Sequence, residues 1–70
     1  MKNYRADIGS WERGRTFNYT ALNNKDALNK AVKERQSNPR VYGDDAFVVQ
    51  IMGPRGYVYD FMSGLMSEES

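Results

Sequence analysis

The sequence predicts an α+β fold: a two-layer ββαββ sandwich in which a four-stranded antiparallel sheet carries one amphipathic helix on one face. Two observations point to this fold. Segments near both ends of the chain alternate apolar and polar residues with the period of a strand, and a stripe of apolar residues at helical spacing lies between them. A length of 70 residues allows one small domain.

The first hairpin is predicted from two alternating segments joined by a loop with a glycine at each end. The first segment alternates charged residues with Tyr4, Ala6 and Ile8. The second segment, residues 15–22, places three apolar side chains on one face: Phe17, Tyr19 and Ala21. Pairing Ile8 with Arg15 aligns the apolar faces of both segments, so we expect that register.

A helix is expected over residues 24–37. Either Asn23 or Asn24 can cap its start, and Asp26 in the first turn suits the positive end of the helix dipole. The pair Asn38-Pro39 ends the helix, because the residue before a proline disfavours helical geometry. The stripe expected to pack on the sheet consists of Ala27, Leu28, Ala31 and Val32.

The second hairpin is predicted around the turn Gly53-Pro54-Arg55-Gly56. Proline suits the second position of a type I turn, and Gly56 suits the left-handed residue of the bulge that follows. That turn pairs Ile51 with Tyr59. The face toward the helix then carries Phe47, Val49, Ile51, Tyr57, Tyr59 and Phe61, and the opposite face carries Val48, Met52, Val58 and Met62.

These assignments predict the core and the extent of the domain. We expect the domain to cover residues 1–62, and residues 63–70, which include Glu68 and Glu69, to form a short flexible acidic tail. The residues expected to be largely buried are Phe17, Leu28, Val32, Phe47, Val49, Ile51 and Phe61.

The composition excludes several kinds of chemistry. The chain has no histidine and no cysteine, which removes disulfides, thiolate chemistry, zinc sites of the Cys/His type and Ser-His-Asp triads. Asp44 and Asp45 are adjacent but lack the spaced oxygen ligands of a calcium loop, so we expect them in a solvated turn. We therefore expect no enzymatic activity, no metal and no cofactor, which leaves a binding module.

The distribution of apolar residues also bears on location. No apolar run approaches the length of about 18 residues that indicates a transmembrane helix. The first residues, Met1-Lys2-Asn3-Tyr4-Arg5, lack the apolar stretch of a signal peptide. We expect a cytoplasmic protein that does not bind a membrane.

The predicted outer face of the second hairpin is the first candidate interaction site. Four apolar side chains are expected to lie together there: Val48, Met52, Val58 and Met62. Exposed patches of this kind, especially methionine-rich ones, serve association with a protein partner or with a second copy of the chain. The alternatives are an ordinary stretch of surface and cover by the segment Leu65-Met66.

The loop of the first hairpin is the second candidate. Trp11 is the only tryptophan, and it either anchors a partner or folds back on the end of the core. Arg13 and Arg15 follow it, and Arg55 occupies the tip of the second hairpin. These basic side chains can meet phosphate groups or acidic protein surfaces, or they are solvated loop charges.

The order of the elements resembles that of the small ββαββ inhibitors encoded by phages and mobile elements, including some type I anti-CRISPR proteins. The resemblance covers residues 4–61. It rests on Gly9-Ser10-Trp11-Glu12-Arg13-Gly14, Asp26-Ala27-Leu28-Asn29-Lys30-Ala31-Val32 and Gly53-Pro54-Arg55-Gly56. It implies a protein that acts stoichiometrically, in the host cell cytoplasm if phage-encoded, by binding a nucleic-acid-handling complex such as a CRISPR effector. The resemblance does not identify any individual functional residue in this chain.

Two functions remain open at the level of sequence. The first is a non-catalytic protein-binding inhibitor or adaptor, with an apolar anchor and arginines that supply charge complementarity. The second is a small nucleic-acid-binding domain that contacts phosphates through its Arg and Lys side chains. The net charge of +1, from 10 basic and 9 acidic residues, is compatible with phosphate contacts without requiring them.

Overall fold

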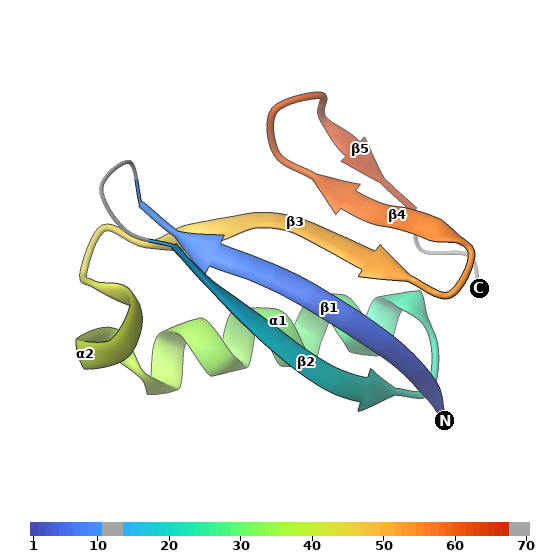
Figure 1. Cartoon of the computed structure of the whole chain (residues 1–70), viewed down its shortest axis with the longest axis horizontal. Helices are drawn as coiled ribbons and strands as arrows, with labels where there is room; N and C mark the ends of the chain where they lie inside the picture. The colour runs from blue at the N-terminus through green and yellow to red at the C-terminus, as the bar shows by residue number, and fades with distance from the viewer. Residues whose placement is uncertain (11–13, 68–70) are drawn as a thin grey trace.

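A computed structural model, which describes residues 1–10 and 14–67, shows an α+β fold with one antiparallel sheet and one main helix. The elements are β1 (Lys2–Gly9), β2 (Gly14–Ala21), α1 (Asn24–Ser37), α2 (Pro39–Tyr42), β3 (Phe47–Gly53), β4 (Gly56–Asp60) and β5 (Leu65–Met66). The strands lie in the order β2-β1-β3-β4-β5 (Figure 1). The predicted α+β class, with an antiparallel sheet and one main helix, is confirmed, but the sheet has five strands rather than four and the order of the elements is not the predicted ββαββ.

The first hairpin has the predicted register. Ile8 pairs with Arg15 and Tyr4 with Tyr19, and the pairing runs without a shift from one end of β1 to the other. Alternation is therefore preserved, so Tyr4 and Ile8 are buried on the helix face.

The fifth strand lies in the segment that was expected to be a tail. After β4 the chain turns through Gly64, whose φ is 75°, and Tyr59 then pairs with Met66. Asp60 holds this turn, because its carboxylate accepts hydrogen bonds from the Met62 N–H and from Ser63 Oγ. The short β5 therefore forms one edge of the sheet.

Helix α1 has the predicted bounds and is capped at both ends. At its start, Asn23 Oδ1 accepts a 2.9 Å hydrogen bond from the Asp26 N–H, and Asp26 Oδ2 accepts one of the same length from the Leu22 N–H. At its end, Asn38 Nδ2 donates to the Glu34 carbonyl. Of the two asparagines that the sequence left open, Asn23 is the cap.

The helix contacts the sheet through small side chains. Ala27 and Ala31 are fully buried, and alanine lets a helix approach the sheet closely. Tyr19 Oη donates a 2.7 Å hydrogen bond to the Ala27 carbonyl, which ties α1 to β2. Leu28 is only half-buried and Val32 is 42% exposed, because both lie on the flank of the helix. The prediction that Val32 is a core residue is wrong.

Helix α2 lies in the stretch that the sequence indicated only as a polar connector. Pro39 starts it, and Tyr42 at its end is buried. Tyr42 Oη donates a 2.8 Å hydrogen bond to Glu34 Oε2 on α1. Arg35 of α1 donates a 3.0 Å bond to the Ala46 carbonyl, so the connector is held against the main helix at two points.

A register shift between β1 and β3 reverses the predicted face of one β3 residue. Asp7 pairs with Gln50, but Ile8 pairs with Val48, so Val49 is an extra residue. Val48 consequently packs against the core beside Ile8. The prediction that Val48 belongs to an exposed patch is wrong.

A second shift lies between β3 and β4. Ile51 pairs with Tyr59 as predicted, but the extra residue is Val58 inside β4 rather than Gly56 in the turn. Val58 is therefore only 3% exposed, while Tyr57, predicted to lie on the face toward the helix, is 52% exposed. The predicted faces of both residues are wrong.

The core consists mostly of residues other than those expected from the sequence. Of the residues expected to be buried, Ile51 is fully buried and Phe61 is exposed. The half-buried members are Phe17, Leu28, Phe47 and Val49. The observed core consists of Tyr4, Ala6, Ile8, Ala21, Ala27, Ala31, Tyr42, Ala46, Ile51 and Val58. Neither helix of the described chain has the length and hydropathy needed to cross a bilayer.

Candidate functional site

The helical layer covers only part of the sheet. Helix α1 packs on β1, β2 and β3, and β4 and β5 extend beyond it (Figure 1). Neighbouring strands lie about 4.8 Å apart, so five strands span about 19 Å, whereas a helix with its side chains is about 10–12 Å wide. One helix cannot cover this sheet, and the half that carries β4 and β5 remains open.

An apolar groove with a volume of about 550 Å³ lies where α1 stops covering the sheet. Its helical wall consists of Leu28, Asn29, Val32 and Arg35, with Ala46 beside them. Its sheet wall consists of Phe47, Val48, Ile51, Tyr59, Phe61 and Met66. We call this site the apolar groove.

The walls of the apolar groove carry large side chains that the fold leaves accessible. Phe61 is 52% exposed, and Val32 and Met66 are also exposed. The ring of Phe61 packs against that of Phe47, with ring centroids 4.9 Å apart and planes inclined by 48°. Phe61 was predicted to belong to the core; because α1 does not reach β4, it lines an open groove instead.

The helical side of the apolar groove carries basic residues. Arg35 is the one charged residue among its lining residues, and its guanidinium also bonds the Ala46 carbonyl. Lys25 and Lys33 are exposed one helical turn to either side of Asn29, which lines the groove. A partner that fills the groove therefore meets an apolar floor and a positive helical margin.

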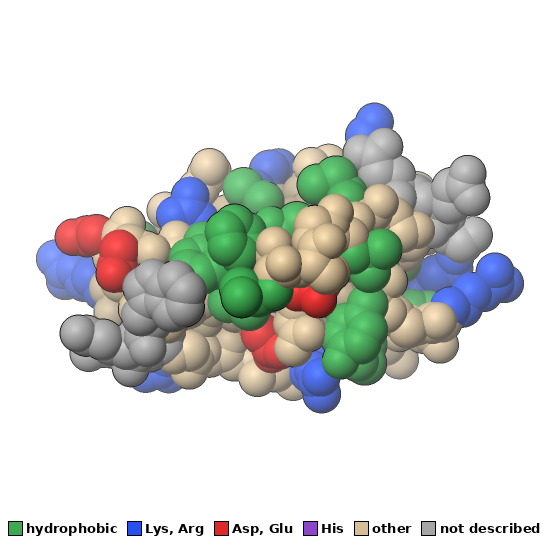
Figure 2. Space-filling view, turned by 90° about the horizontal axis from the view of Figure 1, so that it is seen from above, with side chains coloured by type: hydrophobic (Ala, Val, Ile, Leu, Met, Phe, Trp, Pro, Cys, Tyr) green, Lys and Arg blue, Asp and Glu red, His purple; other side chains and the backbone are tan. Residues whose placement is uncertain are grey.

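Figure 2 looks at the molecule from the side of β4 and β5. Hydrophobic side chains gather in the middle of this face together with a few acidic ones, and most Lys and Arg side chains lie around its margin. A gathered apolar surface with a polar rim is typical of interaction sites on soluble proteins.

The opposite face of the sheet is polar at its centre. Asp7 on β1 accepts a 3.1 Å hydrogen bond from Thr16 Oγ1 on β2 and a 2.8 Å bond from Gln50 Nε2 on β3. These bonds link three neighbouring strands on the face away from α1. Both oxygens of the Asp7 carboxylate therefore have a hydrogen-bond partner. The centre of this face is formed by polar side chains.

The four apolar residues predicted to form the first candidate site do not lie together. Val48 and Val58 face the core, and Met52 is half-buried. Met62 is 75% exposed, but it lies in the turn between β4 and β5. The predicted exposed patch is therefore wrong, because both register shifts turn valines inward.

The predicted basic residues are also dispersed. Arg15 is the second residue of β2, at one end of the sheet, and Arg55 lies in the β3–β4 turn at the other end (Figure 1). Trp11 and Arg13 lie outside the described residues. Among the described residues the structure does not bring Arg15 and Arg55 into one surface.

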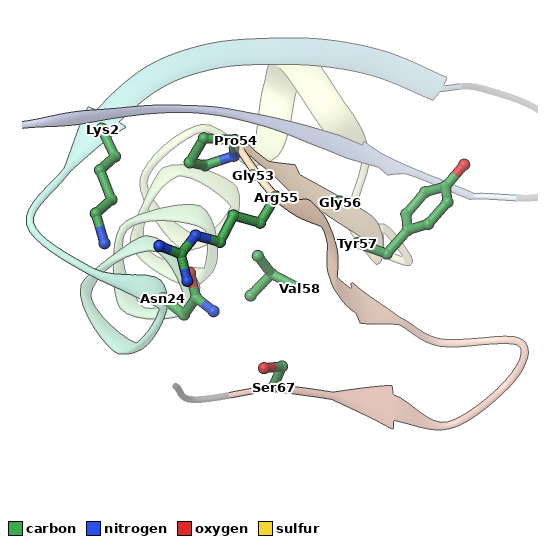
Figure 3. Close-up of a pocket in the computed structure, with 9 residues that line it drawn as sticks. All are labelled: Lys2, Asn24, Gly53, Pro54, Arg55, Gly56, Tyr57, Val58 and Ser67. Carbon is green, nitrogen blue, oxygen red and sulfur yellow. The ribbon is translucent and has the colours of Figure 1, made fainter. Parts of the chain in front are cut away.

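Arg55 instead borders a second cavity, with a volume of about 510 Å³, near the start of α1. Figure 3 shows the side chains of Lys2 and Arg55 extending toward Asn24, while the ring of Tyr57 points away. Asn24 Oδ1 accepts a 2.9 Å hydrogen bond from Tyr4 Oη, so this asparagine has a structural role in the cavity wall.

The titratable groups with displaced pKa values are buried tyrosines, and each has a structural partner. Burial raises the pKa of Tyr42 to about 12, helped by its hydrogen bond to Glu34 and the negative charge of that carboxylate, and opposed by Arg15. Burial, with a smaller contribution from Asp26, also raises the pKa of Tyr4. Within residues 1–10 and 14–67, no three His, Cys, Asp or Glu side chains form a group that could hold a metal ion.

The apolar groove is not among the sites predicted from the sequence, although the sequence contains one signal for it. The helical stripe contains two small residues, Ala27 and Ala31, and two larger ones, Leu28 and Val32. A stripe of this width can contact two surfaces. The small residues suit the surface that packs closest to the helix axis. The larger pair then faces a second surface, which in this chain is the open wall of the groove.

We compared the chain with known protein families, curated proteins and solved structures. No family model matches the chain, and no similar protein was found among curated proteins or solved structures.

Proposed function

We propose that this chain is a non-catalytic protein-binding module, an inhibitor or adaptor, whose apolar groove accepts an amphipathic helix of a partner protein. The observation that carries the proposal is the half-covered sheet, in which α1 packs on β1 to β3 and leaves β4 and β5 open. A second helix beside α1 completes the helical layer.

The dimensions of the groove support a helix as the occupant. Packed helices lie about 8–10 Å apart, which places a second helix over β4 and β5. Its apolar face contacts Val32 on one side and Phe61 and Met66 on the other. Positions i, i+3, i+4 and i+7 of the partner helix supply that face.

The charges specify the margins of the partner helix. Lys25 and Lys33 border the groove on the α1 side, and Arg35 lines it. Acidic residues next to the apolar stripe of the partner complement these charges and raise the association rate. We therefore propose an acidic amphipathic helix.

A displayed library of helical peptides tests this proposal. The library keeps an apolar stripe and randomises the flanking positions between acidic, basic and neutral residues. We expect acidic flanks to be enriched and the selected peptides to bind the wild type. Val32→Lys and Met66→Lys, which place a charge at exposed positions of the groove, should weaken binding about tenfold or more, because charging an apolar contact of this kind costs about 1.4 kcal/mol or more.

Met62→Lys is the matched control. It introduces the same charge at an exposed methionine outside the lining of the groove, so it should leave binding unchanged. Selected peptides that bind Val32→Lys as tightly as Met62→Lys would contradict the groove as the site. Enrichment of peptides with basic flanks would contradict the charge assignment.

A narrower form of the proposal rests on the resemblance to anti-CRISPR proteins. In that form the partner is a subunit of a type I CRISPR effector complex, and occupation of the groove prevents the complex from binding its target DNA. A gel-shift assay with purified effector complex and target DNA tests this. Inhibition at a one-to-one ratio by the wild type and Met62→Lys, but not by Val32→Lys, is the expected result. Equal inhibition by all three proteins, or by none, contradicts it.

A further inference from the structure

Strand β2 forms a long edge of the sheet. It has eight residues, contains neither proline nor lysine, and pairs with β1 without a register shift. Proteins commonly protect such edges with a bulge, a proline, a lysine or a very short strand. The opposite edge follows this rule, since β5 has only two residues.

The direction of the free backbone groups on β2 follows from two contacts with α1. Lys30 Nζ donates a 2.9 Å hydrogen bond to the Thr20 carbonyl, and the Leu22 N–H donates to Asp26 Oδ2. Backbone groups of alternate residues in a strand point to the same edge. The N–H and C=O groups of Thr16 and Asn18 therefore also point away from β1.

The helix thus closes one end of this edge and leaves the middle open. The Thr20 carbonyl already accepts a hydrogen bond from Lys30, and the Leu22 N–H already donates one to Asp26. Thr16 and Asn18 are exposed, and β2 is the terminal strand of the sheet in the part of the chain that the structure describes. Their outward backbone groups are a template for one more strand.

We propose that this strand is β2 of a second copy, paired antiparallel across a two-fold axis. In the register that pairs Thr16 with Asn18 of the second copy, in both directions, the outward groups of both residues bond to each other and the axis passes through Phe17. The interface is then isologous and uses the same residues on both sides.

The side chains in this register are mutually compatible. Phe17 lies opposite its own copy on the helix face, where aromatic cross-strand pairs are favourable. Arg15 lies opposite Tyr19 on the same face, which permits a cation–π contact in each half. Gly14 lies opposite Thr20. No like charges oppose each other between residues 14 and 20, so the edge is complementary to itself.

The test compares Asn18→Pro with Asn18→Ala. Proline removes the outward N–H of residue 18 and leaves the bonds of β2 to β1 in place, which is the position where an edge strand tolerates proline. Alanine removes the same side chain and keeps the N–H. We expect the wild type and Asn18→Ala to sediment with twice the 8.1 kDa mass of one chain at high concentration. Asn18→Pro should dissociate about tenfold more readily.

Amide exchange of the wild type provides a second test that needs no substitution. The amides of Thr16 and Asn18 should exchange more slowly as the protein concentration rises, because the second copy takes up their hydrogens. A wild type that remains monomeric at about 1 mM, equal dimerisation of the two variants, or exchange independent of concentration overturns the proposal. A monomer whose edge instead takes a strand of another protein also overturns it.

Discussion

The ring of Tyr4 occupies the space into which a side chain on Gly53 would project. A Cβ atom on Gly53 would lie 2.8 Å from Tyr4 Cε1, closer than real contacts allow. Tyr4 cannot move aside freely, because it is buried and its Oη donates a hydrogen bond to Asn24 Oδ1. The end of β3 therefore packs directly on the ring that connects β1 to the start of α1.

Gly53→Ala is expected to lower the free energy of unfolding by about 1–3 kcal/mol, because the added methyl group overpacks the core against Tyr4. Gly14→Ala is the matched control, since no atom lies within 4 Å of the Cβ position at Gly14 and its φ is not in the left-handed region. Its effect should stay within about 0.5 kcal/mol. Urea unfolding measures both, and equal stability of the two variants would refute the packing argument.

Two large side chains predicted to be equivalent core residues are expected to differ in their effect on stability. Ile51 is fully buried, so Ile51→Ala should cost about 2–5 kcal/mol. Phe61 lines the open groove, so Phe61→Ala should cost clearly less than Ile51→Ala while removing a side chain that the proposed partner helix would contact. Thermal unfolding of both variants checks the order, and the reverse order would show that Phe61 is a core residue.

The first half of the fold could be predicted from the sequence because its periodicity is uninterrupted. In the first hairpin, one register aligns both apolar faces, and the structure has that register. The start of α1 was indicated by an asparagine cap followed by Asp26, and the cap is Asn23. In both cases a local signal and the tertiary packing agree.

The second half could not be predicted in the same way, because bulges leave no reliable mark in an apolar segment. Every residue from Phe47 to Val49 is apolar, so moving the extra residue by one position costs nothing in the sequence pattern. In β4 the one available signal is chemical. Val58 has no polar atom, whereas Tyr57 and Tyr59 need a partner or solvent for their hydroxyl groups, which favours Val58 as the buried residue.

The predicted candidate site depended on the faces assigned to β3 and β4. Because those faces are wrong, the predicted site is wrong as well. The apolar patch was assigned to the outer face of the second hairpin, but the valines turned inward and the exposed apolar side chains gathered beside α1. The general expectation of an apolar interaction surface remains a prediction. The position of that surface can be predicted only when it is known how many strands the helix leaves uncovered. That number requires knowledge of the fifth strand.

Raising the pH above 10 is expected to destabilise the protein through its buried tyrosines. Burial raises the pKa of Tyr42 from 10.0 to about 12 and also raises that of Tyr4. Between these pH values the unfolded chain releases protons that the folded chain retains, so the free energy of unfolding falls as the pH rises. Below pH 10 both states keep these protons, and the tyrosines contribute no pH dependence.

Tyr42→Phe isolates the contribution of Tyr42, because it removes only the hydroxyl group that titrates. The variant should be less stable than the wild type at pH 8 by about 1 kcal/mol, since the hydrogen bond to Glu34 is lost. Between pH 10 and 12 the wild type should lose up to about 1.4 kcal/mol per pH unit more than Tyr42→Phe. Parallel stability curves for the two proteins would contradict a protonated, buried Tyr42.

Nucleic-acid binding, the alternative function, is expected to be absent near physiological salt. Lys30 is bonded to the Thr20 carbonyl and lies 3.6 Å from Asp26, and Arg35 is bonded to the Ala46 carbonyl. The net charge of +1 provides little long-range attraction to a phosphate backbone. Titration of duplex and single-stranded DNA at about 0.15 M salt should show no specific complex.

A second titration at about 0.05 M salt makes this prediction decisive. Phosphate contacts release counterions, so the logarithm of the affinity falls linearly with the logarithm of the salt concentration, with a slope of about −0.9 per phosphate contact. Binding that is tight at low salt and falls steeply would support a nucleic-acid interface. Lys2 and Arg55, which extend into the same cavity, are then the residues to examine. If they contact phosphates, Lys2→Ala and Arg55→Ala each reduce the salt slope by about one, and the groove variant Val32→Lys leaves it unchanged or raises it. If the groove instead binds a partner helix, Val32→Lys weakens the complex with that helix about tenfold or more, and Lys2→Ala and Arg55→Ala leave it unchanged.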